Sequence, residues 1–417
     1  MTMRATWILA LLGLLAIGST PAAASGDSGE RVMQRIILVR HGIRSPTKAP
    51  ADLAKYAAEP WPSWPVAPGQ LTPHGIETLR SLGRRMAKDL AAAGLPADAC
   101  TGGVSVIADS TPRNRASAEA LLDGLSPACR ATYRAFPSGE DDPLFRGTGD
   151  EDSEDKAGID AASVDDATRA TLAELQQALL GCHDAPCLSK ATADGKQVLL
   201  GGDTARALKT AGSLAENIML AYVQGMPAPA FGWNRLDAAG VARIIGLHNT
   251  SFRLAHATPQ ASRGRGGNML AHITATLAGA AGETTAADPL ATPKTRVLIV
   301  IGHDTDLAAQ AGLLGLGWHG ATRADDFPPG GALIYDLVAT RTGKAIRVSI
   351  AMPTLAALRK GDMAPASAIV AIPLPQPACE GKTACPLPNF LHIATAAIGT
   401  AFDPKAPSEP DVERHPR

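Results

Sequence analysis

The chain has 417 residues and an almost balanced charge, with 39 Lys and Arg residues against 40 Asp and Glu residues. A formal net charge of −1 gives no reason to expect nucleic acid or an anionic membrane surface as a partner. Aromatic residues make up only 4% of the chain, so no platform for stacking bases is indicated. A chain of this length can bury a large core, and we expect two domains.

The N-terminus has the features of a secretory signal. Arg4 supplies a positive charge, residues 7–17 form an apolar stretch, and Ala22–Ala24 offer a small-residue cleavage site. We therefore expect residues 1–24 to be removed and the protein to be periplasmic or secreted. The alternative is an uncleaved membrane anchor, although the apolar stretch is short for a bilayer. A compartment of this kind permits disulfides.

An apolar run ending in Arg40-His41-Gly42-Ile43-Arg44-Ser45-Pro46 is the most informative segment of the chain. A β-branched run bounded by Gly and Pro predicts a buried strand that ends in a loop. Arg40, His41 and Arg44 then lie at the carboxyl end of the strand, where open α/β sheets bind ligands. Guanidinium groups grip phosphate bidentately, and a neutral imidazole among them can attack phosphorus. The alternative is a surface loop with incidental cations.

The next segments alternate between helices and strands. Residues 45–70 are rich in Pro and Trp and predict an ordered loop over the end of the first strand. Thr72-Pro73 is a good helix start, and apolar residues then recur at helical spacing as far as Gly94. Val104 to Ala108 predicts a second strand, and Thr111-Pro112 opens a helix that runs to about Leu122.

Arg113 falls in the first turn of that predicted helix. Free backbone N–H groups and the helix dipole favour an anion at such a position, so a phosphate there would meet two attractions. The alternative is that Arg113 and Arg115 are solvated surface residues.

The second half of the chain begins with an acidic, turn-rich segment, residues 136–166, which we interpret as a solvated loop and a domain boundary. Its spacing lacks the Gly and the terminal Glu of a calcium-binding loop. Helical patterns follow at residues 172–180, 204–223 and 238–254, and a buried strand at 296–301 leads into a helix from about residue 305. Residues 331–338 and 345–350 predict antiparallel strands at the other end of the sheet.

These elements predict an α/β fold: a large α/β domain with a mixed, mainly parallel sheet flanked by helices, and a smaller inserted α-helical domain. We place the first part of the α/β domain at residues 25–150, the inserted domain at 151–257, and the second part, with a C-terminal tail, at 258–417.

Three motifs resemble the histidine acid phosphatases, branch 2 of the histidine phosphatase superfamily. They are the Arg-His-Gly segment, Ile301-Gly302-His303-Asp304-Thr305, and the segment from Ala108 to Arg115. The likeness runs from about Ile36 to about Phe390 and is greatest with bacterial periplasmic phytases, through segments such as residues 61–66, 224–227 and 328–331.

The resemblance implies a mechanism and a set of residues, with no cofactor and no metal. His41 would be the nucleophile that forms a phosphohistidine; Arg40, Arg44, Arg113 and His303 would bind the phosphate; and Asp304 would protonate the leaving alcohol. The alternative for His303-Asp304 is a helix-capping Asp beside a structural His. A carboxyl group that must donate a proton works best in acid, so we expect an acidic pH optimum.

The resemblance also suggests substrate contacts at Thr47, Lys48, His248 and Arg265, each of which could instead be a solvated surface residue. Asp306 stands where phytases usually have Asn, and its charge would repel a polyanion. Asn114 replaces the usual Thr, Thr111 the usual Asp, and Ala332 the common Glu. These departures weaken the case for phytate more than the case for a phosphatase.

The six cysteines allow fifteen disulfide pairings, and spacing alone does not choose among them. Pairing of neighbours, which the resemblance favours, gives Cys100–Cys129, Cys182–Cys187 and Cys379–Cys385. The alternative use, metal binding, is disfavoured because the sequence has no Cys-x-x-Cys pair and no tight Cys/His cluster.

We therefore predict an exported, monomeric acid phosphatase that hydrolyses phosphomonoesters, with phytate and sugar phosphates as substrates. A glucose-1-phosphatase-like or broad-specificity phosphatase is one alternative, and a non-catalytic binding protein for phosphate or inositol phosphates is another. A phosphoglycerate-mutase-like phosphotransferase and a metal-dependent phosphatase are weaker alternatives.

Overall fold

The computed structural model describes residues 30–146, 164–318, 324–400 and 402–412, so the predicted signal peptide lies outside the described residues. A mixed sheet with strand order β7-β6-β5-β1-β4-β2-β3-β9 forms the centre of the molecule, and β8 pairs with β6. The strands are β1 (Arg31–Arg40), β2 (Val104–Ala108), β3 (Tyr133–Arg134), β4 (Val297–Gly302), β5 (Ala332–Thr340), β6 (Gly343–Pro353), β7 (Ile369–Pro373), β8 (Ala384–Pro386) and β9 (Asp411–Val412).

The parallel pairings join β1 to β4, β4 to β2 and β2 to β3, whereas β5, β6, β7 and β8 pair antiparallel on one side and β9 does so on the other. The expected mixed sheet, with its antiparallel strands at the far side, is therefore confirmed. The C-terminal tail is ordered as far as β9, because β9 pairs with β3.

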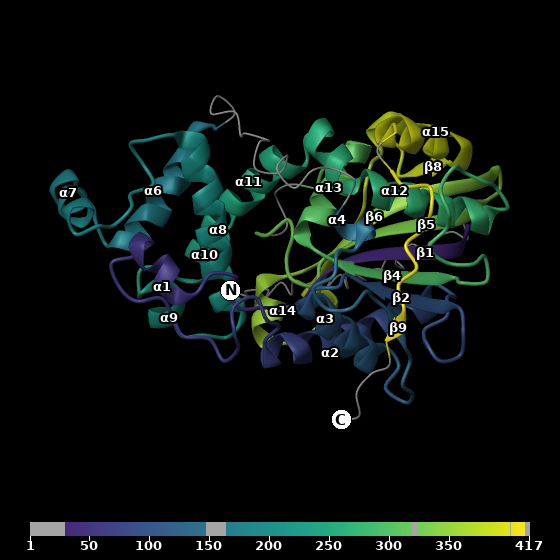
Figure 1. Cartoon of the computed structure of the whole chain (residues 1–417), viewed down its shortest axis with the longest axis horizontal. Coiled ribbons are helices and arrows are strands. Elements are labelled where there is room, and N and C mark those ends of the chain that lie inside the picture. The colour runs from purple at the N-terminus through teal and green to yellow at the C-terminus, as the bar shows by residue number, and fades with distance from the viewer. Residues whose placement is uncertain (1–29, 147–163, 319–323, 401, 413–417) are drawn as a thin grey trace, which may run out of the picture.

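Helices cover both faces of the sheet, and β1 is buried between them. Ile37 and Val39 belong to the core beneath α2 (Pro73–Ala92) and α3 (Pro112–Leu125). Ile36 and Leu38 belong to the opposite core, with α12 (Pro259–Ala281), α13 (Asp304–Leu314) and α15 (Leu387–Ile398). Figure 1 shows the two helix layers on either side of the strands. This burial explains why the sequence of β1 is continuously apolar rather than alternating.

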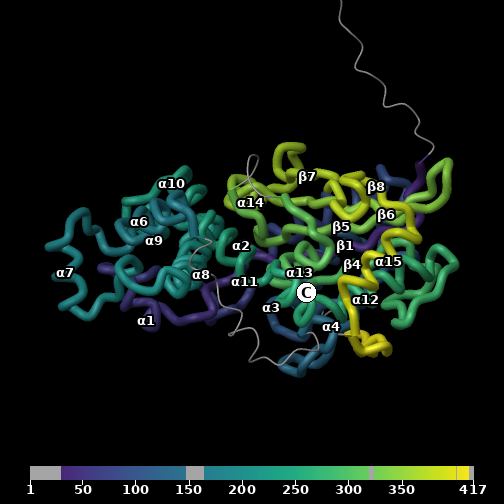
Figure 2. Tube along the Cα trace, turned by 90° about the horizontal axis from the view of Figure 1, so that it is seen from above, coloured from purple at the N-terminus to yellow at the C-terminus, as the bar shows by residue number. Residues whose placement is uncertain are grey.

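A group of helices lies beyond one end of the sheet, as both views show (Figures 1 and 2). Its members are α6 (Asp166–Leu180), α7 (Ala185–Ala193), α8 (Thr204–Val223), α9 (Ala228–Gly232), α10 (Ala238–Ile244) and α11 (Gly246–His256). The loop that follows β1, which contains α1 (Pro50–Leu53), packs against this group. There Trp61 lies edge-on to Trp233, with ring centroids 5.1 Å apart.

The predicted helix over residues 238–254 is in fact two helices, because the chain turns at Ile245 and α11 begins at Gly246. The long helix α12 was not predicted. Its buried residues run without a break from Gly266 to Ala278, so they lie on every side of the helix. A helix buried all round has no apolar stripe from which a period can be read. Among the described helices, none is both long and apolar enough to cross a membrane.

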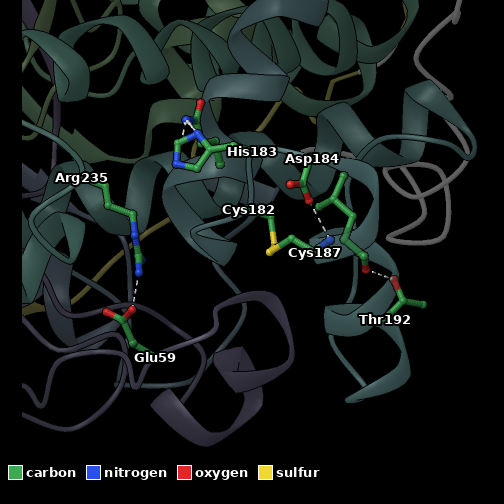
Figure 3. Close-up of a disulfide and its surroundings, with 9 residues drawn as sticks. Glu59, Cys182, His183, Asp184, Cys187, Thr192 and Arg235 are labelled. Atoms are coloured by element: carbon green, nitrogen blue, oxygen red, sulfur yellow. Dashed lines mark hydrogen bonds and ion pairs between the residues drawn. A yellow bond between two sulfur atoms is a disulfide. The ribbon is translucent and has the colours of Figure 1, made fainter.

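The three predicted disulfides, Cys100–Cys129, Cys182–Cys187 and Cys379–Cys385, are all formed. The second of them closes the turn between α6 and α7, where Asp184 also caps α7 by accepting the backbone N–H of Cys187 (Figure 3). Because these cysteines are bonded to one another, their thiolates cannot serve as metal ligands.

Of the acidic segment 136–166, residues 147–163 lie outside the described residues, and the part before them is not simply a solvated loop. Asp142 is fully buried and accepts the backbone N–H of Leu144 at the start of α4 (Pro143–Arg146). Glu409 of the C-terminal tail is also buried. Burial and the nearby Glu409 raise the pKa of Asp142 to about 8. The native protein therefore holds a proton on Asp142 at pH values where the unfolded chain has lost it.

This proton makes stability depend on pH, and we expect Asp142→Asn to remove the part of that dependence that Asp142 causes. Because the folded pKa lies above the unfolded value, stability falls as pH rises from about 4 to about 8, by at most about 1.4 kcal/mol per pH unit. Urea unfolding across this pH range should show a flatter profile for Asp142→Asn than for the wild type. Asp141→Asn, at an exposed neighbour, is the matched control and should keep the wild-type slope. An unchanged slope in Asp142→Asn would show that another group causes the dependence.

Candidate active site

The end of β1 holds His41 by backbone contacts on both sides. The His41 N–H donates to the carbonyl of Gly302 at the end of β4 (2.9 Å), and the Gly330 N–H donates to the His41 carbonyl (3.1 Å). Position 42 requires glycine, since a Cβ there would lie 2.6 Å from Cδ1 of Leu79. The chain can therefore leave the strand tightly against α2, with the imidazole at the sheet edge.

The environment of His41 favours a neutral ring. Its Nδ1–H donates to the Gly42 carbonyl (2.9 Å), which leaves the lone pair on Nε2. Burial, together with Arg40, Arg113 and Arg44, holds the pKa of His41 well below its usual range. A neutral imidazole with a free Nε2 lone pair is the form that can act as a nucleophile.

Arg40 and Arg44 converge on one carboxylate that the sequence did not single out, Glu216 of α8. Arg40 is completely buried; it donates to the Phe327 carbonyl and to Glu216, and its Nη2 lies 2.7 Å from Oδ2 of Asp304. Arg44 donates from Nη2 to both oxygens of Glu216 at 3.2 Å. One feature of the sequence could have identified Glu216: it is a Glu within the otherwise apolar stretch of a predicted helix. Such a residue indicates a buried charge that has a partner.

Arg113 and His303 form the opposite side of the site. Thr111 precedes α3 and Arg113 lies in its first turn, as predicted. Nη2 of Arg113 lies 3.2 Å from Nδ1 of His303, and the His303 ring is edge-on to that of His41 with centroids 5.6 Å apart. Burial and the neighbouring Arg44 lower the pKa of Arg113. Arg115 points elsewhere and donates to the Phe136 carbonyl (2.7 Å).

Asp304 is the first residue of α13, directly after β4. Burial by itself would raise its pKa, but Arg40, His248 and His41 outweigh burial and hold the pKa well below its usual range. Oδ1 of Asp304 accepts the backbone N–H of Thr305 at 2.9 Å, and its Oδ2 lies 2.7 Å from Nη2 of Arg40, so Asp304 does more than cap the helix. The capping carboxylate is Asp306, whose Oδ2 accepts the His303 backbone N–H at 2.7 Å.

The position of Asp306 bears on the repulsion of a polyanion that the sequence suggested. It is buried and only 1% exposed, and its Oδ1 lies 3.6 Å from Nε of Arg265. Burial raises the pKa of Asp306, and Arg265 opposes that rise. Asp306 faces the start of its own helix and a guanidinium, and this weakens the repulsion of a polyanion that the sequence suggested.

The four predicted substrate-contacting residues are placed differently. His248 is buried, 1% exposed, and lies within the site beside Glu216 and Asp304, so it is not a solvated surface residue. Arg265 is half-buried and donates from Nη2 to Oγ1 of Thr305 at 2.9 Å, next to Asp304. Thr47 and Lys48 are exposed in the loop after Pro46.

One group of side chains in the site could in principle hold a cation. The ligand atoms of Glu216, His248 and Asp304 all lie within 4.8 Å of one another. Both carboxylates, however, are already paired with Arg40, and Glu216 also with Arg44. Two guanidinium groups at this distance repel a metal ion and attract an anion instead.

Removal of the shared carboxylate should destabilise the fold. In Glu216→Ala, Arg44 and part of Arg40 are left buried without a counter-charge, and we expect the free energy of unfolding to fall by about 3 kcal/mol. Urea unfolding would measure the loss. Glu174→Ala, which breaks an exposed pair with Arg243, is the control and should have a far smaller effect. Equal effects of the two substitutions would contradict a buried structural role for Glu216.

Comparisons with known proteins agree with this geometry. The family model described as histidine phosphatase superfamily (branch 2) matches residues 31–350. Phytase AppA of Escherichia coli (strain K12) is 31% identical over 435 residues, which span 94% of this chain and 98% of that protein. Glucose-1-phosphatase of Salmonella typhimurium (strain LT2) is 24% identical over 321 residues, or 72% of this chain and 75% of that protein.

The same likeness holds for solved structures. Hafnia alvei phytase in complex with myo-inositol hexakis sulphate superposes with a TM-score of 0.76 at 27% identity, covering 90% of this chain and 98% of that one. Family and fold thus agree along most of the chain. The chain belongs to branch 2 of the histidine phosphatase superfamily and is a phytase-like acid phosphatase, a hydrolase of phosphomonoesters.

Proposed function

We propose that this enzyme hydrolyses inositol phosphates, with phytate among them, and related sugar phosphates through a phosphohistidine on His41. The observation that supports this most is the neutral, buried imidazole of His41 surrounded by Arg40, Arg44 and Arg113. A phosphate dianion would find its charge balanced there, and the nucleophile would already be in the reactive form.

The proposed reaction has two steps. Nε2 of His41 attacks phosphorus, Arg40, Arg44, Arg113 and His303 bind the phosphoryl oxygens, and Asp304 gives its proton to the leaving oxygen. In the free enzyme Arg40 favours the ionised form of Asp304. A bound phosphate dianion offsets that positive charge, so Asp304 can take up the proton that it donates, most readily in acid. Water then cleaves the phosphohistidine, with Asp304 as the base.

The proposed substrates are inferred from the residues around the site and from the proteins that this chain resembles. His248 and Arg265 adjoin Asp304 and would meet parts of the substrate beyond the reacting phosphate, and the exposed Thr47 and Lys48 would meet its outer groups. The Hafnia alvei enzyme was solved with myo-inositol hexakis sulphate, a hexa-anion of similar shape to phytate. The likeness to glucose-1-phosphatase makes a sugar phosphate the second candidate substrate.

Relative kcat/KM values for phytate, glucose 1-phosphate and p-nitrophenyl phosphate on the purified mature chain test this proposal. We expect turnover of all three in acid, with phytate preferred, and full activity in EDTA. A preference for glucose 1-phosphate would support the second candidate substrate. Tight binding of phosphate without turnover of any substrate would show a binding protein, and loss of activity in EDTA would show a metal-dependent enzyme.

Export, domain division and oligomeric state are further parts of the proposal. We propose cleavage after residue 24, export to the periplasm or medium, action as a monomer, and domain segments at 25–150, 151–257 and 258–417. The three disulfides support an oxidising compartment. Mass spectrometry of the mature protein from periplasm and medium tests the cleavage, and light scattering tests the monomer.

A further inference from the structure

Asn114 occupies a central position behind the phosphate-binding His303, although the reaction assigns it no part. It is completely buried in the first turn of α3, one residue after Arg113. Its Nδ2 donates to Oδ2 of Asp109 (2.8 Å) and to Oγ1 of Thr111 (2.9 Å). The same Oδ2 of Asp109 accepts from Nε2 of His303 at 2.9 Å. One carboxylate oxygen therefore joins Asn114 to His303, and Nδ2 of Asn114 also lies 3.0 Å from Nε2 of His303. Because the Asp109 carboxylate can only accept, Nε2 of His303 is assigned as its donor.

The neighbours determine how the amide and the imidazole are oriented. If the amide of Asn114 were turned over, its oxygen would face the Asp109 carboxylate, so the NH2 group must point there. Because Nε2 of His303 donates to Asp109, Nδ1 of His303 is the ring nitrogen that faces Arg113, at 3.2 Å. This orientation presents Nδ1 to the space where Arg113 would bind phosphate.

The charge on Asp109 maintains this arrangement. Burial by itself raises the pKa of Asp109, but hydrogen bonds from His303, Asn114 and Thr111 bring it well below the usual range. Three further charged groups act on Asp109: Arg113 of the same helix, Asp306 of α13, and Asp142, which keeps its own proton until about pH 8. In acid Asp142 is neutral, so it does not repel a charge on Asp109. The hydrogen-bond donors are then the groups that keep Asp109 ionised.

We propose that Asn114 is a positioning residue that keeps Asp109 ionised in acid and thereby holds His303 with Nδ1 toward the phosphate. This rests on the proposed function, since it assigns His303 to phosphate binding. Without the donor, Asp109 is protonated at higher pH, its carboxyl group no longer orients His303, and phosphate binding weakens on the acid side of the pH profile.

The test compares Asn114→Leu, which has a similar volume and no donor, with Asn114→Thr, whose hydroxyl group can still donate to Asp109. For p-nitrophenyl phosphate, we expect Asn114→Leu to lose about tenfold in kcat/KM near pH 3.5 and less than about twofold near pH 6. Asn114→Thr should restore most of the activity in acid. In ¹⁵N NMR spectra of labelled histidine at pH 3.5, the signal of the His303 Nε2–H that donates to Asp109 should be the same in the wild type and Asn114→Thr, and it should be shifted in Asn114→Leu.

Each result decides the proposal. An equal loss at both pH values with a lower melting temperature would show that Asn114 acts only in packing and would overturn the proposal, as would an unchanged pH profile. If Asn114→Leu does not fold, Asn114→Ala, which removes the same donor with a smaller side chain, takes its place: loss of activity in acid alone supports the proposal, and an unchanged profile refutes it. Absence of turnover by the wild type would instead refute the proposed function.

Discussion

His41→Ala should lose at least about 10⁴-fold in kcat/KM for every phosphomonoester while keeping its fold. The reason is that Arg40, Arg44 and Arg113 would still attract the substrate, but the imidazole proposed to form the bond to phosphorus would be gone. The imidazole contributes one hydrogen bond, to the Gly42 carbonyl, so the melting temperature should change little. Steady-state kinetics and calorimetry on the same preparation would measure both effects.

The covalent intermediate can be tested directly. Wild-type enzyme denatured in alkali during turnover should carry phosphate on the peptide that contains His41, whereas His41→Ala should carry none. His183→Ala, at an exposed histidine beyond the sheet, is the matched control and should behave as the wild type in both tests (Figure 3). Substantial turnover by His41→Ala would remove the phosphohistidine mechanism, even though the family assignment would stand.

Asp304→Asn should separate substrates by their leaving group. Asparagine retains an oxygen that can accept from Arg40, but it has no proton to give. For glycerol 2-phosphate, whose alkoxide leaves poorly, we expect kcat to fall by about 10²–10³-fold. For p-nitrophenyl phosphate the leaving phenolate is stable without a proton, so the loss should be within about tenfold. Kinetics on the two substrates at the same acidic pH would show the difference.

The pH profile gives a second test of Asp304 as the proton donor. Wild-type kcat/KM for glycerol 2-phosphate should fall as pH rises from acid towards neutrality, because the proton on Asp304 becomes harder to retain, and this fall should be absent from Asp304→Asn. Asp306→Asn is the control two residues away, where the side chain caps α13 and should not distinguish between leaving groups. Equal losses on both substrates in Asp304→Asn would exclude Asp304 as the proton donor.

Sequence reasoning was most successful where the signal was local. The motif around His41 places a strand, a turn and three charged residues within a few positions, and backbone geometry alone then puts them at the sheet edge. Thr72 as the N-cap of α2 and Arg113 in the first turn of α3 were predicted for the same reason, since a helix start depends on adjacent residues. The disulfide pairing, in contrast, was implied by the family resemblance, because spacing alone left fifteen pairings open.

Tertiary structure alone decided which distant groups meet the motif. Glu216 is 176 residues from Arg40, and it reaches Arg40 only because the helices beyond the sheet pack with α8 against the loop after β1. The same packing buries His248, and the capping geometry of α13 turns Asp306 away from the substrate. The sequence by itself predicted the proposed nucleophile, the arginines around it and the chemistry they would permit, because each depends on residue type and local spacing. The partners of those arginines, the orientation of His303 and the division of one predicted helix into two depended on long-range packing, which residue spacing does not encode.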